Sequence, residues 1–191
     1  MSILSDITIK ELANDPTHPM IVPFEPESVR FNKDGEKIPS YGLSSYGYDV
    51  QLAPTFKIFS NVNAGVIDPL NPQGDEIFHE VNADHCILPP HSYLLSHTVE
   101  TFNIPRDVLV LCVGKSTWAR LAIAVNVTPI EPEFKGQVVI EIANLTSLPV
   151  VIHAGVGICQ FLFLKGDKPC DVSYSQRDGK YNGQTGITLA K

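Results

Sequence analysis

Nine short apolar or alternating runs fill the chain between about residues 48 and 164, and turn-forming residues separate them. Examples are YDVQLA, TFKIF, DVLVLCV, GQVVIEIANLT and ICQFLFL. Evenly spaced short strands with turn signals between them are typical of an all-β sandwich or barrel. The 15 prolines and 13 glycines agree with a turn-rich β fold. We therefore predict an all-β chain.

Helical spacing is confined to two places. SDITIKELAND, at residues 5–15, predicts a short N-terminal helix that Ser5 or Asp6 caps and that Asp15-Pro16 ends. Residues 116–124, STWARLAIA, are the one later segment that we expect to hold a helical turn.

Size and charge limit the classes of function. The 191 residues, 43% hydrophobic and 18% charged, are enough for one domain, 1–191, with its own core. The net charge of -7 disfavours nucleic acid and anionic membranes as partners. No apolar run approaches the ~18 residues of a membrane span, and the N-terminus does not resemble a signal peptide. We therefore expect a cytoplasmic protein. Its cysteines are widely spaced, so in that compartment we expect free, mostly buried thiols: Cys86, Cys112, Cys159 and Cys170.

The stretch VGKSTWAR, residues 113–120, contains the last letters of a nucleotide-binding P-loop. That loop needs a first glycine five residues before Gly114 and a strand–loop–helix context. Position 109 is a leucine inside a strand-like run, so we exclude a P-loop. Ser116 and Arg120 are four residues apart and share a face of a helical turn, with Lys115 beside them. This arrangement predicts either a local anion site or an ordinary charged surface turn.

Glu141 stands out in the strand-like run Val138–Ala143, where it follows Ile140 and precedes Ile142. A carboxylate in such a run is either an outward-facing surface group or a general acid/base with a partner such as Arg120. The polar, glycine-rich end of the chain, 175–191, is likewise either a frayed tail or a mobile lid that orders over a ligand.

Several separated motifs resemble the dCTP deaminase family, within the dUTPase-like superfamily. They are YGLSSYGYDVQL, ILPPHSYLLSHTVETFNIPRDVL, the run from GKSTWARLAIAVNV to GICQFLF, and SYSQRDGKYNGQTGITL, and they occur in the same order. The resemblance implies a distorted β-barrel that assembles as a homotrimer with active sites at subunit interfaces. It implies hydrolysis of dCTP to dUTP and ammonia, which feeds dUMP and dTTP synthesis, and it makes dTTP a candidate inhibitor.

The same resemblance assigns the site. The catalytic positions are Ser116, Arg120 and Glu141. The positions that match nucleotide contacts, or flank them in the motif, are Lys115, Thr117, Trp118, Ala119, Val139, Ile140, Gln160, Tyr174, Lys180 and Gln184. The chain departs from the common TYARCG by reading TWARLA, which changes residues 118, 121 and 122.

The chemistry predicted for these residues uses no catalytic metal. The chain lacks the H-x-E and P-C-x-x-C signature of zinc deaminases, so a carboxylate must activate the water. We expect Glu141 to shuttle the proton, Ser116 to position the water, and Arg120 to support the developing charge. Mg²⁺ is expected to arrive on the triphosphate, because the protein has few cations to offset it. Phe134 is our candidate for excluding a 2′-hydroxyl.

Two other functions stay open. One is a combined dCTP deaminase and dUTP pyrophosphatase that yields dUMP. Members with the combined activity read IDPGF at a turn where this chain reads IEPEF, which favours the single activity. The other is a non-catalytic β-barrel that binds nucleotides.

Overall fold

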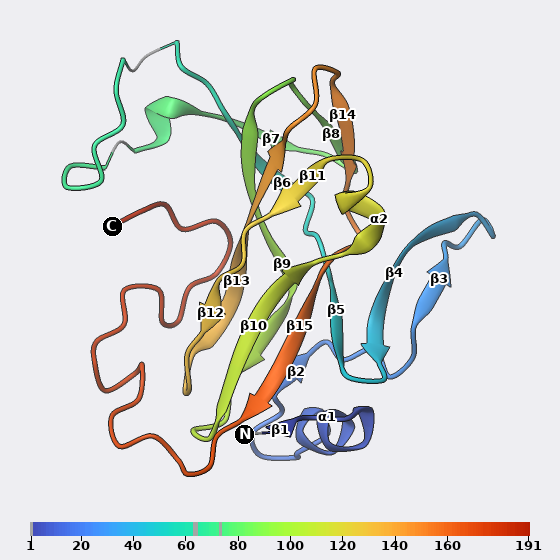
Figure 1. Cartoon of the computed structure of the whole chain (residues 1–191), viewed down its shortest axis with the longest axis vertical. Helices are drawn as coiled ribbons and strands as arrows, with labels where there is room; N and C mark the ends of the chain where they lie inside the picture. Colours follow the sequence, from blue (N-terminus) through green and yellow to red (C-terminus); the bar gives the residue numbers. More distant parts are fainter. Residues whose placement is uncertain (1, 63–64, 73) are drawn as a thin grey trace.

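Two antiparallel β-sheets form the body of the protein, and the computed structural model describes residues 2–62, 65–72 and 74–191 (Figure 1). The larger sheet contains β1 (Ser2–Ile3), β3 (Val29–Phe31), β4 (Lys37–Ser44), β5 (Gly47–Gln51), β10 (Val108–Gly114), β12 (Pro129–Ile130) and β15 (Gly157–Lys165). Its strands lie in the order β12–β10–β15–β5–β4–β3, and β1 pairs with β15.

The smaller sheet contains β2 (Ile21–Val22), β6 (Thr55–Phe59), β7 (Phe78–Asn82), β9 (Tyr93–Asn103), β11 (Ile123–Val125) and β13 (Lys135–Asn144). Its order is β11–β13–β9–β6–β7, and β2 pairs with β9. A separate hairpin joins β8 (His85–Leu88) to β14 (Val150–His153). The helical elements are α1 (Asp6–Ala13), α2 (Ser116–Ala119) and a 3₁₀ turn at Asp75–Ile77.

One hydrophobic core draws side chains from both sheets. Phe102 of β9 meets Phe161 of β15 with ring centroids 5.0 Å apart. The predicted all-β fold with a short N-terminal helix is confirmed, and it is a distorted barrel whose two sheets are not joined into one closed ring. No helix within the described residues is long and apolar enough to cross a bilayer.

Most predicted elements are where the sequence pattern placed them. All nine runs hold strands, α1 lies within residues 5–15, and α2 supplies the later helical turn. Ser5 is the N-cap residue of α1, but its side chain makes no capping hydrogen bond. The four cysteines are free, and three of them are buried.

β13 begins at Lys135, directly after the turn IEPEF. Within β13, Val138, Ile140 and Ile142 are buried while Val139 and Glu141 lie on the other face and are half-buried. The two isoleucines beside Glu141 therefore face the core and do not surround its carboxylate.

A buried carboxyl group lies in the core between the sheets. Glu100 of β9 is 1% exposed, and both of its carboxyl oxygens accept hydrogen bonds from the Gln51 backbone N–H, at 3.1 and 3.2 Å. Burial raises the pKa of Glu100 to about 7. The core therefore holds an acid whose charge state changes near neutral pH.

Candidate active site

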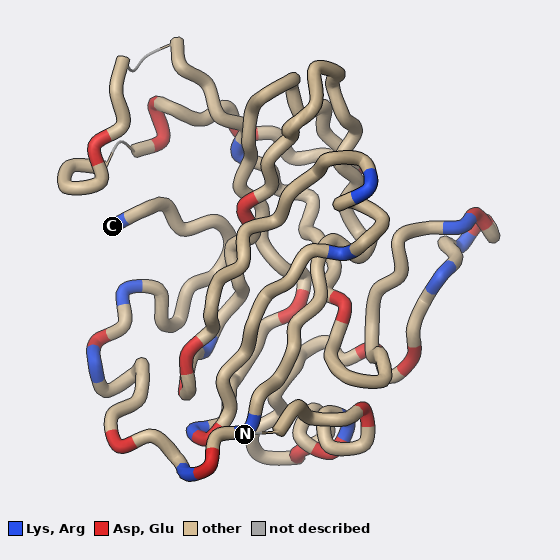
Figure 2. The backbone as a smooth tube through the Cα atoms, in the orientation of Figure 1, with Lys and Arg blue, Asp and Glu red and all other residues tan. Residues whose placement is uncertain are grey.

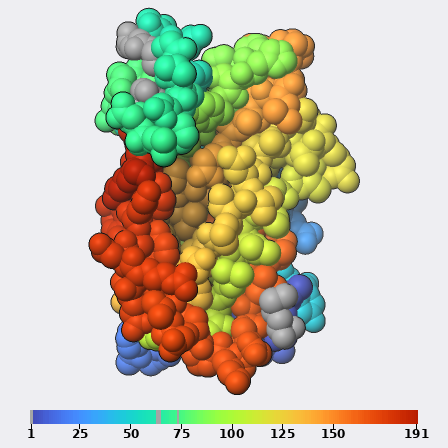
Figure 3. All heavy atoms as spheres, turned by 60° about the vertical axis from the view of Figure 1, so that its left-hand side comes forward, coloured from blue at the N-terminus to red at the C-terminus, as the bar shows by residue number. Residues whose placement is uncertain are grey.

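A cavity of about 490 Å³ lies between the smaller sheet and the C-terminal tail. In Figure 3 the tail and the loop residues 65–72 lie along the left of the view, and the surface is hollowed between them and the strands of the body. The lining residues come from four parts of the chain. They are Ile67, Asp68, Pro69, Pro72, Ile77 and Phe78; Tyr93 and Leu95; Thr128–Glu131, Phe134, Val138, Val139 and Glu141; and Tyr174, Tyr181, Gln184, Thr188, Leu189 and Ala190.

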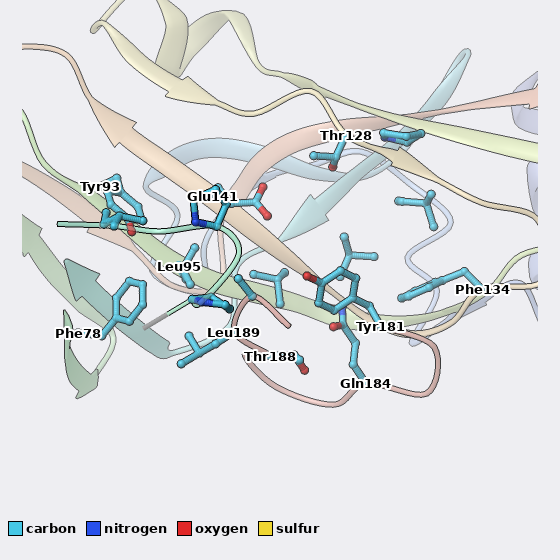
Figure 4. Close-up of a pocket in the computed structure, with 18 of the residues that line it drawn as sticks. Phe78, Tyr93, Leu95, Thr128, Phe134, Glu141, Tyr181, Gln184, Thr188 and Leu189 are labelled. Atoms are coloured by element: carbon cyan, nitrogen blue, oxygen red, sulfur yellow. The ribbon is translucent and has the colours of Figure 1, made fainter. Parts of the chain in front are cut away.

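The Glu141 carboxylate points into this cavity, toward the space between Thr128 and the tail residues Tyr181 and Gln184 (Figure 4). Glu141 is paired across the sheet with Leu95, which also lines the cavity. Burial raises the pKa of the Glu141 carboxyl above its usual value. A raised pKa favours a role in which the carboxyl group accepts a proton and later returns it.

The cavity of a single chain is acidic. Asp68, Glu131 and Glu141 line it, and no lysine or arginine does so among the described residues. No ion pair within the described part of the chain involves Glu141. A triphosphate would be repelled here unless cations came from outside this cavity.

The K-S-T-W-A-R motif lies elsewhere, at α2 on the edge of the larger sheet (Figure 1). Ser116, Thr117, Ala119 and Arg120 are exposed, and the Arg120 guanidinium donates a 3.0 Å hydrogen bond to the carbonyl of Ser116. This residue is therefore ordered within its own turn. None of the four lines the Glu141 cavity.

Trp118 and Lys115 fix this motif to the body. The buried Trp118 donates through Nε1 to the Gly157 carbonyl at 2.9 Å. The Lys115 ammonium pairs with the buried carboxylate of Asp49 and donates to Ser40 Oγ at 3.3 Å. The sequence alone did not single out Asp49. The only local signal is that this acidic residue stands beside apolar residues in the β5 strand.

The structure therefore brings together four of the predicted site residues and separates the rest. Glu141, Val139, Tyr174 and Gln184 line one cavity. The others lie outside it: Ser116, Arg120, Lys115, Thr117, Trp118 and Ala119 in the motif, Ile140 in the core, Gln160 bonded to Ser44 Oγ at 2.9 Å, and Lys180 bonded to the Lys191 carbonyl at 2.8 Å.

The tail lies along the start of β13. Gln137 N–H donates to the Gln184 carbonyl at 3.0 Å, and the Gln184 side-chain amide donates to the Gln137 carbonyl at 2.8 Å. Gly183 N–H donates to the Lys135 carbonyl at 2.7 Å. Gln184 Oε1 is buried without a hydrogen-bond partner in the described structure, so it can still accept one from a ligand. The segment expected to be a lid is thus docked over the cavity, and its mobility stays a prediction.

A second set of contacts holds the beginning of the tail. The Arg106 guanidinium donates to the carbonyls of Cys170 and Asp171 at 3.0 and 2.8 Å, and to Gln176 Oε1 at 2.8 Å. Glu133 accepts from Ser175 Oγ at 2.9 Å and lies 3.7 Å from Arg106. Glu133 has a left-handed backbone, with φ of 63°, at the turn position where the combined enzymes have glycine.

Phe134, the candidate for excluding a 2′-hydroxyl, lines the cavity, and its role stays a prediction. It is buried at the edge of the cavity, and its ring centroid is 6.2 Å from that of Tyr174. Thr128 and residues 188–190, which the sequence did not single out, also line the cavity, as does Tyr181 of the tail. The polar composition and the family motif of the tail indicated this region, but neither predicted which tail residues pair with β13.

Comparison with known proteins assigns the family. A sequence model described as dCTP deaminase-like matches residues 3–166. The chain belongs to the dCTP deaminase-like family. Relatives of this dCTP deaminase-like chain include the dCTP deaminase of Acinetobacter baylyi, 52% identical, and that of Halorhodospira halophila, 51% identical. Both alignments extend over 191 residues and cover the whole of each chain.

A solved structure supports the fold of this dCTP deaminase-like chain. The crystal structure of 2′-deoxycytidine 5′-triphosphate deaminase from Agrobacterium tumefaciens superimposes with a TM-score of 0.58 at 20% identity. The match covers 86% of this chain, and this chain spans 48% of that one. At this identity the likeness establishes a shared fold.

Proposed function

We propose that the protein catalyses the hydrolytic deamination of dCTP to dUTP and ammonia. The observation that carries this proposal is Glu141, a carboxylate with a raised pKa in a cavity of about 490 Å³. A cavity of this size accommodates a nucleoside. The full-length relatives at 51–52% identity are named dCTP deaminases, which supports the same substrate.

Glu141 acts as the proton shuttle. Its carboxylate takes a proton from water as the water oxygen bonds to C4 of cytosine, and the proton passes to N3. A second proton transfer through Glu141 to the amino group lets the C4–N bond break and ammonia leave. Ser116 positions the water, and Arg120 holds Glu141 and stabilises the charge that develops.

These roles require two chains at each site. Glu141 lines a cavity without lysine or arginine among the described residues, whereas Ser116 and Arg120 are exposed on α2 outside it. We therefore place the active sites at the interfaces of a homotrimer, where α2 of one copy faces the acidic cavity of the next. Large exposed apolar side chains beside α2 support burial of this surface: Leu121, Val127, Leu145 and Leu148.

The nucleotide is held by the remaining matched residues. We assign nucleotide contacts to Lys115, Thr117, Val139, Ile140 and Gln160, and Lys115 offsets part of the triphosphate charge. Trp118 and Ala119 shape the motif between them. Tyr174, Lys180 and Gln184 close over the phosphates from the tail, and Phe134 excludes a 2′-hydroxyl. Mg²⁺ accompanies the triphosphate as part of the substrate, and dTTP is a candidate inhibitor of the same site.

Ammonia release from dCTP with Mg²⁺ tests the proposal, followed by chromatography of the nucleotide product. We expect dUTP and ammonia in equal amounts. Accumulation of dUMP with pyrophosphate would instead assign the combined activity. A folded protein that binds dCTP and releases no ammonia above background would overturn the proposal in favour of a nucleotide-binding barrel.

A further inference from the structure

A hairpin formed by β3 and β4 projects from the body beside α2 (Figure 1). Its tip is a closed turn, because Asn32 N–H donates to the Glu36 carbonyl at 2.9 Å and Gly35 N–H donates to the Asn32 carbonyl at 3.1 Å. Its base is held by the pairing of β4 with β5 from Gly42 to Ser44. The hairpin, which we call the arm, is therefore a built element with a defined position.

A second cavity, of about 530 Å³, lies between the arm and α2. The arm contributes five of its lining residues and α2 contributes the sixth, Thr117. The lining is Arg30, Lys37, Ile38, Pro39, Ser40 and Thr117. It holds two cations and two hydroxyl groups, and no carboxylate lines it in the described part of the chain. Figure 2 shows basic positions along the arm on a chain that is acidic overall.

The two cations of this cavity are free to bind an anion. No carboxylate within the described residues forms an ion pair with Arg30 or Lys37. Glu36, which precedes Lys37 in the sequence, accepts a 2.8 Å hydrogen bond from the Asn32 side-chain amide at the arm tip. Two unpaired cations around an open cavity repel each other, and a polyanion between them removes that repulsion.

Lys115, the lysine of the K-S-T-W-A-R motif, is already paired with a carboxylate, unlike Arg30 and Lys37 in the part of the chain that the structure describes. The ammonium of Lys115 is paired with the buried carboxylate of Asp49 and bonded to Ser40, so most of its charge is already balanced. A polyphosphate that reaches Thr117 therefore meets uncompensated positive charge mainly from the arm. Arginine and lysine with nearby hydroxyl groups are the usual protein ligands of phosphate oxygens.

We propose that Arg30 and Lys37 are substrate-binding residues, and that the cavity between arm and α2 receives the triphosphate end of the nucleotide. That the ligand is a nucleotide rests on the proposed function. That the cavity binds a polyphosphate rests on its geometry and charge alone. The arm supplies the cations that the acidic Glu141 cavity lacks. A nucleotide with fewer phosphates gains less from them.

Substitution of the two cations tests this inference with a matched control on the same hairpin. Arg30→Gln and Lys37→Gln remove charges that line the cavity, whereas Lys33→Gln removes an arm-tip charge that does not line it. We expect each cavity substitution to raise KM for dCTP by about 10-fold and to leave kcat within about twofold, because a charge-assisted contact is lost. Lys33→Gln should keep KM near that of the wild type.

Binding measurements separate this inference from the assigned reaction. Calorimetric titration with inorganic tripolyphosphate, dCTP and dCMP is carried out on the wild type and on the three variants. The inference predicts that Arg30→Gln and Lys37→Gln weaken binding of tripolyphosphate and dCTP by about 10-fold and leave dCMP unchanged. Tripolyphosphate should also compete with dCTP. These results stand even if no ammonia is released.

Three outcomes overturn the inference. Arg30→Gln and Lys37→Gln could each bind dCTP and tripolyphosphate as the Lys33→Gln control does. Binding of dCMP and dCTP could fall equally, which indicates a general loss of structure. Tripolyphosphate could bind without displacing dCTP, which makes the cavity a separate anion site. Unchanged thermal unfolding of each variant is required before the comparison.

Discussion

The backbone of Gln184 passes so close to Gly136 that a Cβ atom on the glycine would lie 2.5 Å from the Gln184 carbonyl oxygen. Gly136 also has a φ of +133°, which residues other than glycine rarely adopt. The second residue of β13, the strand that carries Glu141, is therefore a glycine whose missing side chain makes room for the tail.

Gly136→Ala should release the tail from β13. We expect loss of amide protection at Gln137 and Gly186, both of which donate to tail or strand acceptors, and a fall in kcat/KM for dCTP. Hydrogen exchange followed by mass spectrometry measures the first effect. Gly155→Ala is the control, because Gly155 has a φ of +69° but no atom within 4 Å of an added Cβ. Equal exchange in both variants would show that the clash does not hold the tail.

Glu141→Gln should abolish turnover and preserve binding, since the amide keeps the shape of the side chain but cannot accept a proton from water and return it. A loss in kcat of ~10³-fold or more is expected from general acid–base catalysis, with Kd for dCTP within about threefold of the wild type. Steady-state ammonia release and calorimetry measure the two quantities. Glu131→Gln removes another carboxylate of the same cavity and should cost far less activity. Near-normal turnover in Glu141→Gln would mean that another group is the base.

Mixed trimers test whether Glu141 and Ser116 come from different chains. Ser116→Ala and Glu141→Gln should each be inactive alone and regain activity when co-expressed. Each site needs an intact Ser116 from one chain and an intact Glu141 from its neighbour. With random assembly of equal amounts of the two variants, each condition is met with a probability of about one half, so about a quarter of the sites are complete. Specific activity of the mixture against the wild type measures this fraction. No recovery in trimers shown to be mixed would place both residues in one chain.

Glu100 predicts a pH-dependent stability that does not involve the site. Its pKa is about 7 in the folded chain against an ordinary value of 4.5, so the folded state binds more protons than the unfolded state between these values. The contribution of Glu100 to stability is therefore complete below about pH 4.5 and is lost as the pH rises through about 7. The shift corresponds to ~3 kcal/mol.

Denaturant unfolding at several pH values checks this prediction. The free energy of unfolding of Glu100→Gln should increase relative to that of the wild type as the pH rises from about 4.5 to about 7, because glutamine does not ionise. The paired measurement removes the contribution of all other titrating groups. Parallel pH profiles for the two proteins would contradict an elevated pKa at Glu100.

The strands were readable from the sequence because alternation and turn residues are local signals. β13 is the clearest case: Val138, Ile140 and Ile142 are buried in the order that their spacing predicts, and Glu141 lies on the opposite face. Three residues that the family motifs singled out, Glu141, Tyr174 and Gln184, line one cavity, and their roles stay predictions.

Features that depend on distant parts of the chain were not readable. Nothing near Lys115 in the sequence indicates its pairing with Asp49, and the arm at residues 29–44 lacks the apolar runs that marked the other strands. The register of the tail on β13 is set by backbone hydrogen bonds, which any sequence can make. The glycine at position 136 does not by itself indicate that Gln184 packs against it.

The Arg106 contacts change how closure over a ligand should be regarded. Because Arg106 holds the chain at Cys170, Asp171 and Gln176, the tail begins from a fixed point beside the cavity. The chain entropy that a free terminal segment loses when it finds its docking site has therefore been lost largely on folding. A bound nucleotide needs to order only the last few residues, so little of its binding energy is diverted from holding the base and phosphates.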